Sequence, residues 1–232
     1  EAFSKLGAQT ILVDKDERAL KESVTKLGVG HKYFPIDVTH SDAANQALLA
    51  AINNFGGLDI LISNAGAAHA GPMLDISNEE LRNAFELNFF SHYSFSTEAA
   101  KILKDQNRGG QILFNISKQA VNPGKNFGAY GLPKATTFFL MRQLALELGS
   151  DGIRVNGINA DRIRSGLLTD EFISSRAKSR GVSESEYMAG NLLNKEVTAE
   201  HVADAFTALA CAESTTGHVM TVDGGNIEAS LR

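Results

Sequence analysis

Two residues four positions apart, Tyr130 and Lys134, have the types and spacing that most clearly suggest chemistry. On a helix, side chains four residues apart lie on the same face, one turn from each other. A tyrosine phenol is a poor base at neutral pH, because its ordinary pKa is about 10. A neighbouring ammonium group favours the phenolate and lowers that pKa, so Lys134 could make Tyr130 a general acid or base. The same spacing also occurs without any catalytic role on many solvated helices.

The elements that position this pair are predicted from short apolar runs that alternate with helical periodicity. Strands are predicted over 8–13, 33–36, 58–62, 111–116, 153–158 and 218–222. Helices are predicted over 41–55 with Ser41 as cap, and over 16–27, 78–105, 128–148 and 198–212. Short helices and loops are expected over 166–190. Alternating strands and helices predict an α/β fold, a parallel sheet with helices on both faces.

Composition narrows the class of protein. The chain has 232 residues, of which 43% are hydrophobic, and no linker divides it, so we expect one domain over 1–232. A net charge of −5 with no basic stripe argues against a nucleic-acid partner. No apolar run approaches the ~20 residues of a membrane span and no signal peptide opens the chain, which favours a cytoplasmic location without a membrane partner.

The single cysteine, Cys211, excludes an internal disulfide and a cysteine-built metal site, and we expect no metal. Its neighbours over 206–210 are mostly apolar, so a buried and inert thiol is predicted.

Ligands of parallel α/β sheets bind beyond the carboxyl ends of the strands, where this chain has polar residues. Asp14 ends the first predicted strand, where an acid can accept hydrogen bonds from a ribose and repel a 2′-phosphate, which favours NAD over NADP. The alternative is a cap of the following helix. Asp37 ends the second strand and could accept from an adenine amino group while Val38 packs on the ring, or could equally cap a helix.

Two further features remain open on the residues alone. Asn64-Ala65-Gly66 follows the third predicted strand, where small residues allow close approach to a ligand or simply form a tight turn. Asn88 lies inside a mostly apolar helix, where a buried amide needs partners. It either satisfies backbone groups or helps to hold an ordered water.

Taken in order along the chain, these residues resemble the classical short-chain dehydrogenase/reductase family. The resemblance rests on Ser63-Asn64-Ala65-Gly66, Asn88, Ser117, the Tyr130-Gly131-Leu132-Pro133-Lys134 segment, and Val222-Asp223-Gly224-Gly225. It implies a Rossmann-like, doubly wound sheet and an NAD-dependent oxidoreductase that transfers a hydride between nicotinamide and a small alcohol, aldehyde or ketone. It also implies a homo-oligomer, a dimer or tetramer.

The resemblance assigns roles to individual residues. Ser117 would orient and polarise the substrate oxygen, and Tyr130 would move the proton. Lys134 would lower the Tyr130 pKa and hold the nicotinamide ribose, while Asn88 would hold a water that links Lys134 to solvent. The implied cofactor-binding residues are Asp14, Asp37, Val38, Asn64, Ala65, Gly66, Tyr130, Lys134, Ile163 and Ser165.

The segment 159–165 departs from the family, which usually has Pro-Gly there. By register, Ile163 would meet the nicotinamide carboxamide and Ser165 would replace a threonine. Arg162 and Arg164 are extra cations that could bind a carboxylate or phosphate of the substrate, with Ser117 and Gln119 in the same substrate-binding set. The alternative is that both arginines pair with Asp161 or Asp170.

The second departure is at the start of the chain, because the family's first strand and glycine-rich turn are not recognisable. In the family that strand lies between those containing Val13 and Ile60, so two rows of backbone groups are expected to lose their partner. The turn would supply N–H donors for pyrophosphate. An alternative function is therefore a catalytically impaired, folded or oligomerising module.

A narrower resemblance concerns the loops 116–119, 124–128 and 159–168. They are similar to the dehydrogenase half of bifunctional rhamnulose-phosphate aldolase/alcohol dehydrogenases, in which an aldolase part precedes the dehydrogenase. This resemblance implies a small aldehyde such as lactaldehyde as the substrate.

Overall fold

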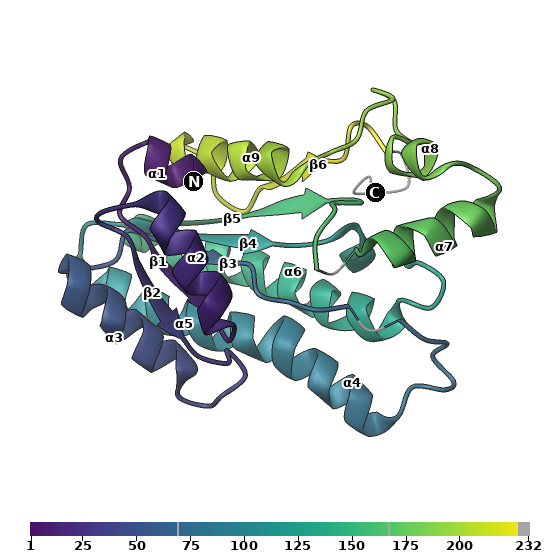
Figure 1. The fold of residues 1–232 in the computed structure, drawn as a ribbon. Coiled ribbons are helices and arrows are strands. Elements are labelled where there is room, and N and C mark those ends of the chain that lie inside the picture. The colour runs from purple at the N-terminus through teal and green to yellow at the C-terminus, as the bar shows by residue number, and fades with distance from the viewer. Residues whose placement is uncertain (69, 167, 227–232) are drawn as a thin grey trace.

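The structure, a computed structural model, describes residues 1–68, 70–166 and 168–226, over which strands alternate with helices (Figure 1). The strands are β1 (Ile11–Asp14), β2 (Lys32–Pro35), β3 (Ile60–Ser63), β4 (Gly110–Asn115), β5 (Ile153–Ala160) and β6 (Val219–Val222). The α-helices are α1 (Ala2–Lys5), α2 (Glu17–Leu27), α3 (Ala43–Phe55), α4 (Asn78–Phe85), α5 (Ser91–Gln106), α6 (Gly128–Leu148), α7 (Asp170–Arg180), α8 (Glu184–Met188) and α9 (Ala199–Cys211). Every predicted strand is present, which confirms the α/β fold class.

The described strands pair in parallel and form two sheets. The larger sheet holds β3, β4, β5 and β6 in that order, and the smaller one holds β1 beside β2. In the larger sheet Leu61 pairs with Ile112, which pairs in turn with Val155. Because these strands run in one direction, their carboxyl ends meet at one edge. The residues that follow β3, β4 and β5 are therefore brought together there.

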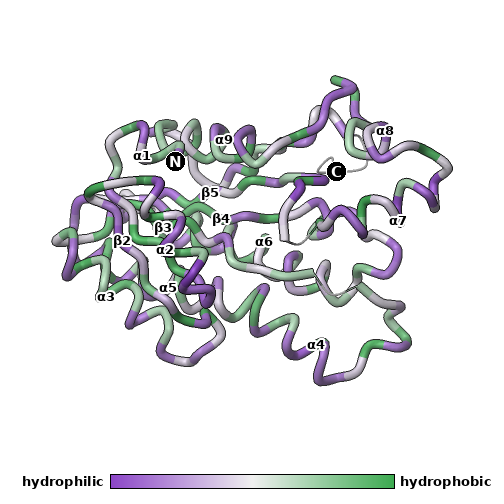
Figure 2. Tube along the Cα trace, viewed as in Figure 1, coloured by the Kyte–Doolittle hydropathy of each residue, from purple (hydrophilic) through white to green (hydrophobic). Residues whose placement is uncertain are grey.

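Helices cover both faces of the larger sheet, as the doubly wound architecture requires. On one face Leu103 of α5 and Met141 of α6 form a buried cluster with Ile112 and Phe114 of β4. On the other face Phe206 and Leu209 of α9 cover Leu113 and Ile158. Figure 1 shows α9 and α1 above the sheet and α5 and α6 below it. Figure 2 shows hydrophilic and hydrophobic residues alternating along the outer helices α2 and α4.

No ladder joins β1 to β3 in the described part of the chain, so the sheet is interrupted between them. The small sheet is nevertheless held in place from one side, because Val13 of β1 and Leu61 of β3 pack against the same cluster of α3 and α5 residues. Ile62 of β3 is partly exposed beside the interruption. Strands β1 and β3 thus share a layer of helices without sharing hydrogen bonds.

Three local predictions are wrong. The predicted continuous helix over 78–105 is divided by a π-helical turn, Glu86–Phe90. Ser41 does not cap α3, because the helix begins at Ala43 and places Asp42 at the N-cap position. Cys211 is exposed rather than buried, since two residues after Leu209 a side chain points to the opposite side of α9.

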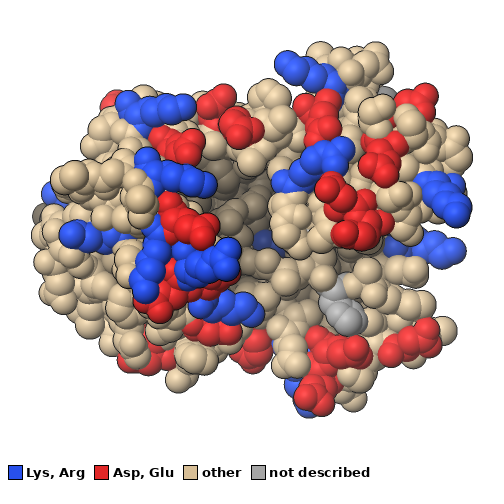
Figure 3. All heavy atoms as spheres, in the orientation of Figure 1, with Lys and Arg blue, Asp and Glu red and all other residues tan. Residues whose placement is uncertain are grey.

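The outer face shows charges of both signs interspersed, with a hollow between the α2 side and the α7–α8 side (Figure 3). None of the helices in the described ranges combines the length and apolarity needed to cross a membrane.

Candidate active site

Helix α6 brings Tyr130 and Lys134 to the sheet edge because both belong to its core-facing stripe. Tyr130, Lys134, Thr137 and Met141 are all buried and recur at intervals of three or four residues. The stripe packs on the sheet through its later residues, so its first turn lies beside the carboxyl end of β4. A Cβ at Gly131 would lie 3.0 Å from the Gln119 carbonyl oxygen, and glycine therefore permits this close approach.

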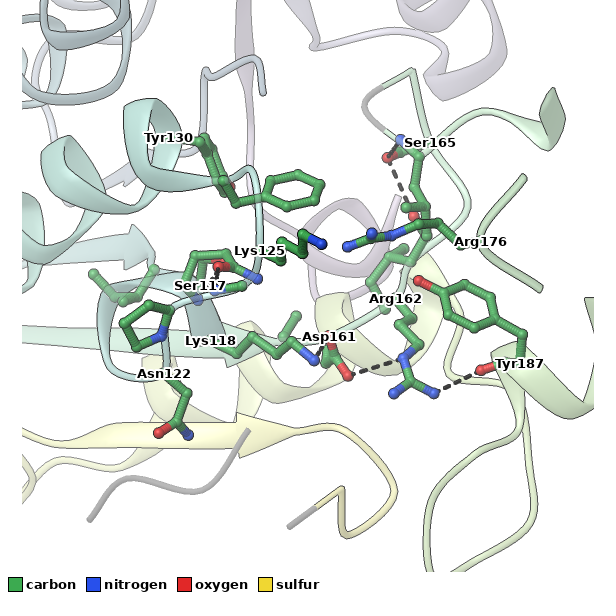
Figure 4. Close-up of a pocket in the computed structure, with 18 of the residues that line it drawn as sticks. Ser117, Lys118, Asn122, Lys125, Tyr130, Asp161, Arg162, Ser165, Arg176 and Tyr187 are labelled. Atoms are coloured by element: carbon green, nitrogen blue, oxygen red, sulfur yellow. Dashed lines mark hydrogen bonds and ion pairs between the residues drawn. The ribbon is translucent and has the colours of Figure 1, made fainter. Parts of the chain in front are cut away.

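Ser117 reaches the same place from β4. It follows that strand at the N-cap of a short 3-10 turn, Lys118–Ala120, and accepts a hydrogen bond from the Gln119 N–H at 3.2 Å. Its side chain also hydrogen-bonds the Tyr130 hydroxyl. Both residues line a cavity of about 620 Å³ (Figure 4). The structure thus brings together the three residues on which the sequence argument depends.

The pKa of Tyr130 is shifted in the direction opposite to the prediction. Burial raises the pKa of the phenol, and the hydrogen bond with Ser117 only partly counteracts that shift. The Lys134 ammonium stands 5.9 Å from the centroid of the Tyr130 ring. Desolvation therefore dominates the pKa of the phenol, which stays protonated at neutral pH.

Lys134 is almost completely buried, and none of the carboxylates in the described ranges pairs with it. Its Nζ donates to the Asn115 carbonyl oxygen at 3.0 Å and lies 3.5 Å from Nε2 of His92. Burial lowers the pKa of Lys134 from 10.5 to about 8. The ammonium is thus held by neutral acceptors, which makes it unusually easy to deprotonate.

Asn88 lies in the π-helical turn, and its amide satisfies backbone groups. Its Nδ2 donates to the carbonyl oxygens of Ala67 at 2.9 Å and Ala84 at 3.0 Å, while its Oδ1 accepts from the Ala67 N–H at 3.2 Å. A Cβ at Gly66 would lie 2.8 Å from that Oδ1. Gly66 thus permits the loop after β3 to approach Asn88. The contacts of Asn88 are those expected if it satisfies backbone groups, the first of the two roles left open by the sequence.

His92 is a buried residue of the site that the sequence argument missed. Its Nδ1 lies 2.6 Å from the Ser63 hydroxyl, and its Nε2 faces Lys134. Burial and the nearby ammonium hold the pKa of His92 well below its usual range. The sequence feature that could have identified His92 is its position four residues after Asn88, which places both residues on one helical face.

The residues expected around the adenosine lie at the ends of β1 and β2. Asp14 is exposed at the end of β1, and its carboxylate accepts from the Asp16 N–H at 3.0 Å. Asp37 accepts from the Thr39 N–H at 3.0 Å, which lowers the pKa of its carboxyl group. Val38 packs against the α3 cluster. Local turn contacts therefore account for the polar contacts that Asp37 makes in this structure.

The remaining cofactor candidates flank the catalytic residues. Asn64 is exposed and accepts from the Asn115 amide at 2.8 Å, and the Ala65 backbone is hydrogen-bonded to His92. Ile163 and Ser165 line the cavity, and the Ser165 hydroxyl donates to the Ile163 carbonyl oxygen at 3.2 Å. Ile163 and Ser165 thus share the cavity of the Ser117 and Tyr130 hydroxyls, whereas Asn64 and Ala65 contact the neighbouring Asn115 and His92.

The substrate candidates divide into two groups. Gln119 and Arg162 line the cavity, and the Gln119 Oε1 accepts from the Gly124 N–H at 2.7 Å. Arg164 does not line it and instead pairs with Asp170 and Glu196, each at 2.7 Å. We therefore remove Arg164 from the substrate-binding set, because its charge is compensated outside the cavity.

Known proteins are similar to this chain in sequence and in fold. A family model described as enoyl-(acyl carrier protein) reductase matches residues 1–226. An uncharacterized oxidoreductase of Bacillus subtilis, YuxG, is 35% identical over 198 residues, which is 82% of this chain and 29% of that protein's length. The 7alpha-hydroxysteroid dehydrogenase of Escherichia coli is 29% identical over 231 residues, covering 97% of this chain and 87% of that one.

A solved structure has the same fold. The 3-ketoacyl-(acyl-carrier-protein) reductase of Brucella melitensis, complexed with NADH, superposes with a TM-score of 0.85 at 24% identity over 97% of this chain and 90% of that one. Together with the match over nearly the whole chain and the Ser117, Tyr130 and Lys134 cluster, these likenesses identify the chain as a member of the short-chain dehydrogenase/reductase family of oxidoreductases.

Proposed function

We propose that this protein is an NAD-dependent oxidoreductase that interconverts a small alcohol and its aldehyde or ketone. The observation that carries the proposal is the convergence of the Ser117 and Tyr130 hydroxyls on one cavity, with the Lys134 ammonium one helical turn behind. When bound, the nicotinamide supplies or accepts the hydride.

The chain's own residues position the substrate and move the proton. The Ser117 hydroxyl donates to the carbonyl oxygen and orients it, and the Tyr130 hydroxyl delivers a proton to the same oxygen in reduction. A raised Tyr130 pKa suits that acid role, because the phenol keeps its proton at neutral pH. Lys134 holds a positive charge near the phenolate that forms, and it would hold the ribose of a bound cofactor.

The cofactor assignment is supported by the carboxyl edge of the sheet. Asp14 ends β1 there, Asn64 and Gly66 follow β3, and all three are exposed. Ile163 and Ser165 line the cavity beside the reactive hydroxyls. An acid at the end of β1 accepts from ribose hydroxyls and repels a 2′-phosphate. A relative of the same fold was solved with NADH. We therefore propose NAD rather than NADP.

The interrupted sheet favours a second candidate function, a folded module that binds nucleotide weakly or not at all. Dinucleotides lie across the carboxyl edge of a continuous sheet, and here β1 and β3 share no hydrogen bonds among the described residues. In that case the catalytic side chains would be present but the cofactor would not be held across the interruption.

Calorimetric titration and turnover separate the two candidates. We expect NAD to bind in the micromolar range and small alcohols to yield NADH, with NADP at least about tenfold weaker because Asp14 repels its phosphate. Asp14→Asn should reduce that discrimination. Asp16→Asn, two residues further on at the N-cap of α2, is the control, because asparagine is also a good N-cap. Failure of NAD to bind even at millimolar concentration would leave the weakly binding module as the function.

The narrower proposal, a lactaldehyde-type substrate, rests on the loop resemblance. This chain spans 29% of the length of YuxG, so at least one relative is a longer oxidoreductase. On the same resemblance, we propose that these residues correspond to the dehydrogenase half of an aldolase/alcohol dehydrogenase. Lactaldehyde, which is uncharged, is therefore one substrate to assay beside the anionic substrates proposed below.

We also propose that the chain forms a homo-oligomer through the outer face of α5 and α6. Phe90, Tyr93, Leu132, Phe139 and Leu146 expose large apolar side chains there, with Phe139 at 68% and Leu146 at 81% exposure. Phe139→Glu should convert the oligomer to a monomer in light scattering, because it places a charge in the contact. Val29→Glu, at a more exposed apolar position beyond α2, should leave the mass unchanged. A monomeric unaltered chain would contradict this proposal.

A further inference from the structure

The cavity beside Tyr130 is basic in a protein whose net charge is −5. Its lining includes five cationic side chains and one acid, Asp161; the cations are Lys118, Lys125, Arg162, Arg176 and Arg180. A concave site lined by one sign of charge concentrates ligands of the opposite sign. Some of these cations pair with a carboxylate of the residues that the structure describes, and others do not.

Asp161 compensates the charges of two of these cations, Lys118 and Arg162. Its carboxylate lies 3.1 Å from the Lys118 ammonium and 3.4 Å from Nε of Arg162. Arg162 also donates to the Tyr187 carbonyl oxygen at 2.6 Å and stacks over the Tyr187 ring at 4.9 Å. Arg162 is thus held by contacts within the protein, and we assign it to the lining of the cavity rather than to the binding of an anion.

Arg176 of α7 is held differently. Its guanidinium carbon lies 5.4 Å from the centroid of the Phe127 ring and 5.5 Å from that of Phe172, so two aromatic rings fix its position. Its Nε is buried and has no hydrogen-bond partner. A buried donor without a partner is destabilising unless a ligand supplies one. The structure thus orients a guanidinium group whose Nε–H donor is not used by the described residues.

Lys125 and Arg180 complete the cationic rim. Figure 4 shows the Lys125 ammonium and the Arg176 guanidinium pointing toward each other across the cavity. Arg180 lies over the ring of Tyr187 at 5.3 Å. Within the described ranges none of Lys125, Arg176 and Arg180 forms an ion pair with a carboxylate. Like charges facing each other are unfavourable unless an anion lies between them.

We propose that the substrate of this oxidoreductase carries a carboxylate or phosphate group, which binds between Lys125 and Arg176 while its carbonyl oxygen meets Ser117 and Tyr130. A guanidinium fork matches both anions through paired N–H donors. The inference rests on the proposed function for the position of the reacting carbon, whereas the anion site itself depends only on the cations.

Matched substrate pairs test the inference in the presence of NADH. Dihydroxyacetone is compared with dihydroxyacetone phosphate, and butan-2-one with acetoacetate, so that the two arms distinguish phosphate from carboxylate. At least one anionic partner should have a kcat/KM about 10- to 100-fold higher than its neutral counterpart, since each hydrogen bond to a charged group contributes that much. Equal values within both pairs would overturn the inference.

Variants assign the effect to the site. Arg176→Gln and the more exposed Lys125→Gln should each raise KM for the anionic partner about 10-fold or more, without raising KM for NADH. Arg142→Gln is the matched control, because Arg142 also lies over a phenylalanine ring, at 5.8 Å from Phe138, but does not line the cavity. A rise in KM for NADH alone would assign these cations to the cofactor and overturn the proposal.

Measuring anion binding directly separates the anion-site proposal from the oxidoreductase proposal. Calorimetric titration with malonate and with phosphoglycolate should show heat that is lost in Arg176→Gln and Lys125→Gln and kept in Arg142→Gln. Binding of this kind without turnover of any pair would support the anion site while the oxidoreductase proposal fails. Turnover without anion binding would support the oxidoreductase proposal and overturn the anion site.

Discussion

Replacing Tyr130 with phenylalanine is expected to lower kcat by about 10²- to 10⁴-fold, the usual contribution of a positioned general acid or base. The ring would stay in place, because Tyr130 is buried in the first turn of α6 and only its hydroxyl reaches Ser117. Substrate and NAD should therefore bind as before. Single-turnover kinetics beside equilibrium titration measures the two effects separately.

The matched control for this change is Tyr93→Phe, which removes an exposed hydroxyl from α5. It should leave kcat unchanged. If Tyr130→Phe keeps the full rate while the control behaves as expected, the proton in this reaction is not carried by the phenol and the proposed mechanism is wrong.

Lys134→Met is expected to lower activity and raise stability together. Loss of the ammonium removes a charged hydrogen-bond donor from the reacting groups, which should reduce kcat/KM about 10- to 100-fold. The shift of the Lys134 pKa from 10.5 to about 8 means that protonated Lys134 destabilises the fold by about 3 kcal/mol. The Asn115 carbonyl oxygen loses its donor, which offsets about 1 kcal/mol or more. The free energy of unfolding of Lys134→Met should therefore exceed that of the unaltered protein by about 1–2 kcal/mol at neutral pH.

The same substitution predicts a pH dependence whose sign is fixed by the direction of the shift. Below about pH 8 both folded and unfolded chains hold the Lys134 proton, so the full destabilisation is present. Between about 8 and 10.5 the unfolded chain binds the proton and the folded chain does not. The free energy of unfolding contributed by this group therefore rises with pH through that window. The advantage of the methionine variant should disappear there.

Denaturant unfolding of both proteins at pH 7 and at several higher pH values measures this difference. Lys101→Met is the control, because Lys101 forms only an exposed pair with Glu98 at 2.6 Å and should change stability little. A Lys134 variant that is less stable than the unaltered protein at neutral pH would show that its hydrogen bonds outweigh its desolvation.

His92 connects the buried Lys134 to the end of β3. It faces Lys134 on one side and Ser63 on the other, and each of these partners comes from a different element. Since burial keeps the imidazole neutral, it can accept from the Lys134 ammonium without adding a second charge. The pair of a buried lysine and a neutral histidine thus explains how a cation is tolerated without a carboxylate partner.

The amino-acid sequence by itself determined the elements and the pair on α6. Apolar runs and helical periodicity are local patterns, and Tyr130 and Lys134 share a face because four residues make about one turn. The order of strands and helices likewise fixed that Ser117 and Asn64 meet at one edge, because parallel strands end together.

Only the tertiary structure decided the environment of those residues. It placed His92 against Lys134, raised rather than lowered the Tyr130 pKa, and interrupted the long helix at Asn88. It also paired Arg164 outside the cavity and aimed Arg176, which no motif singled out, into it. Burial, ion pairing and desolvation depend on neighbours that are far apart in the chain, so a local pattern carries no information about them.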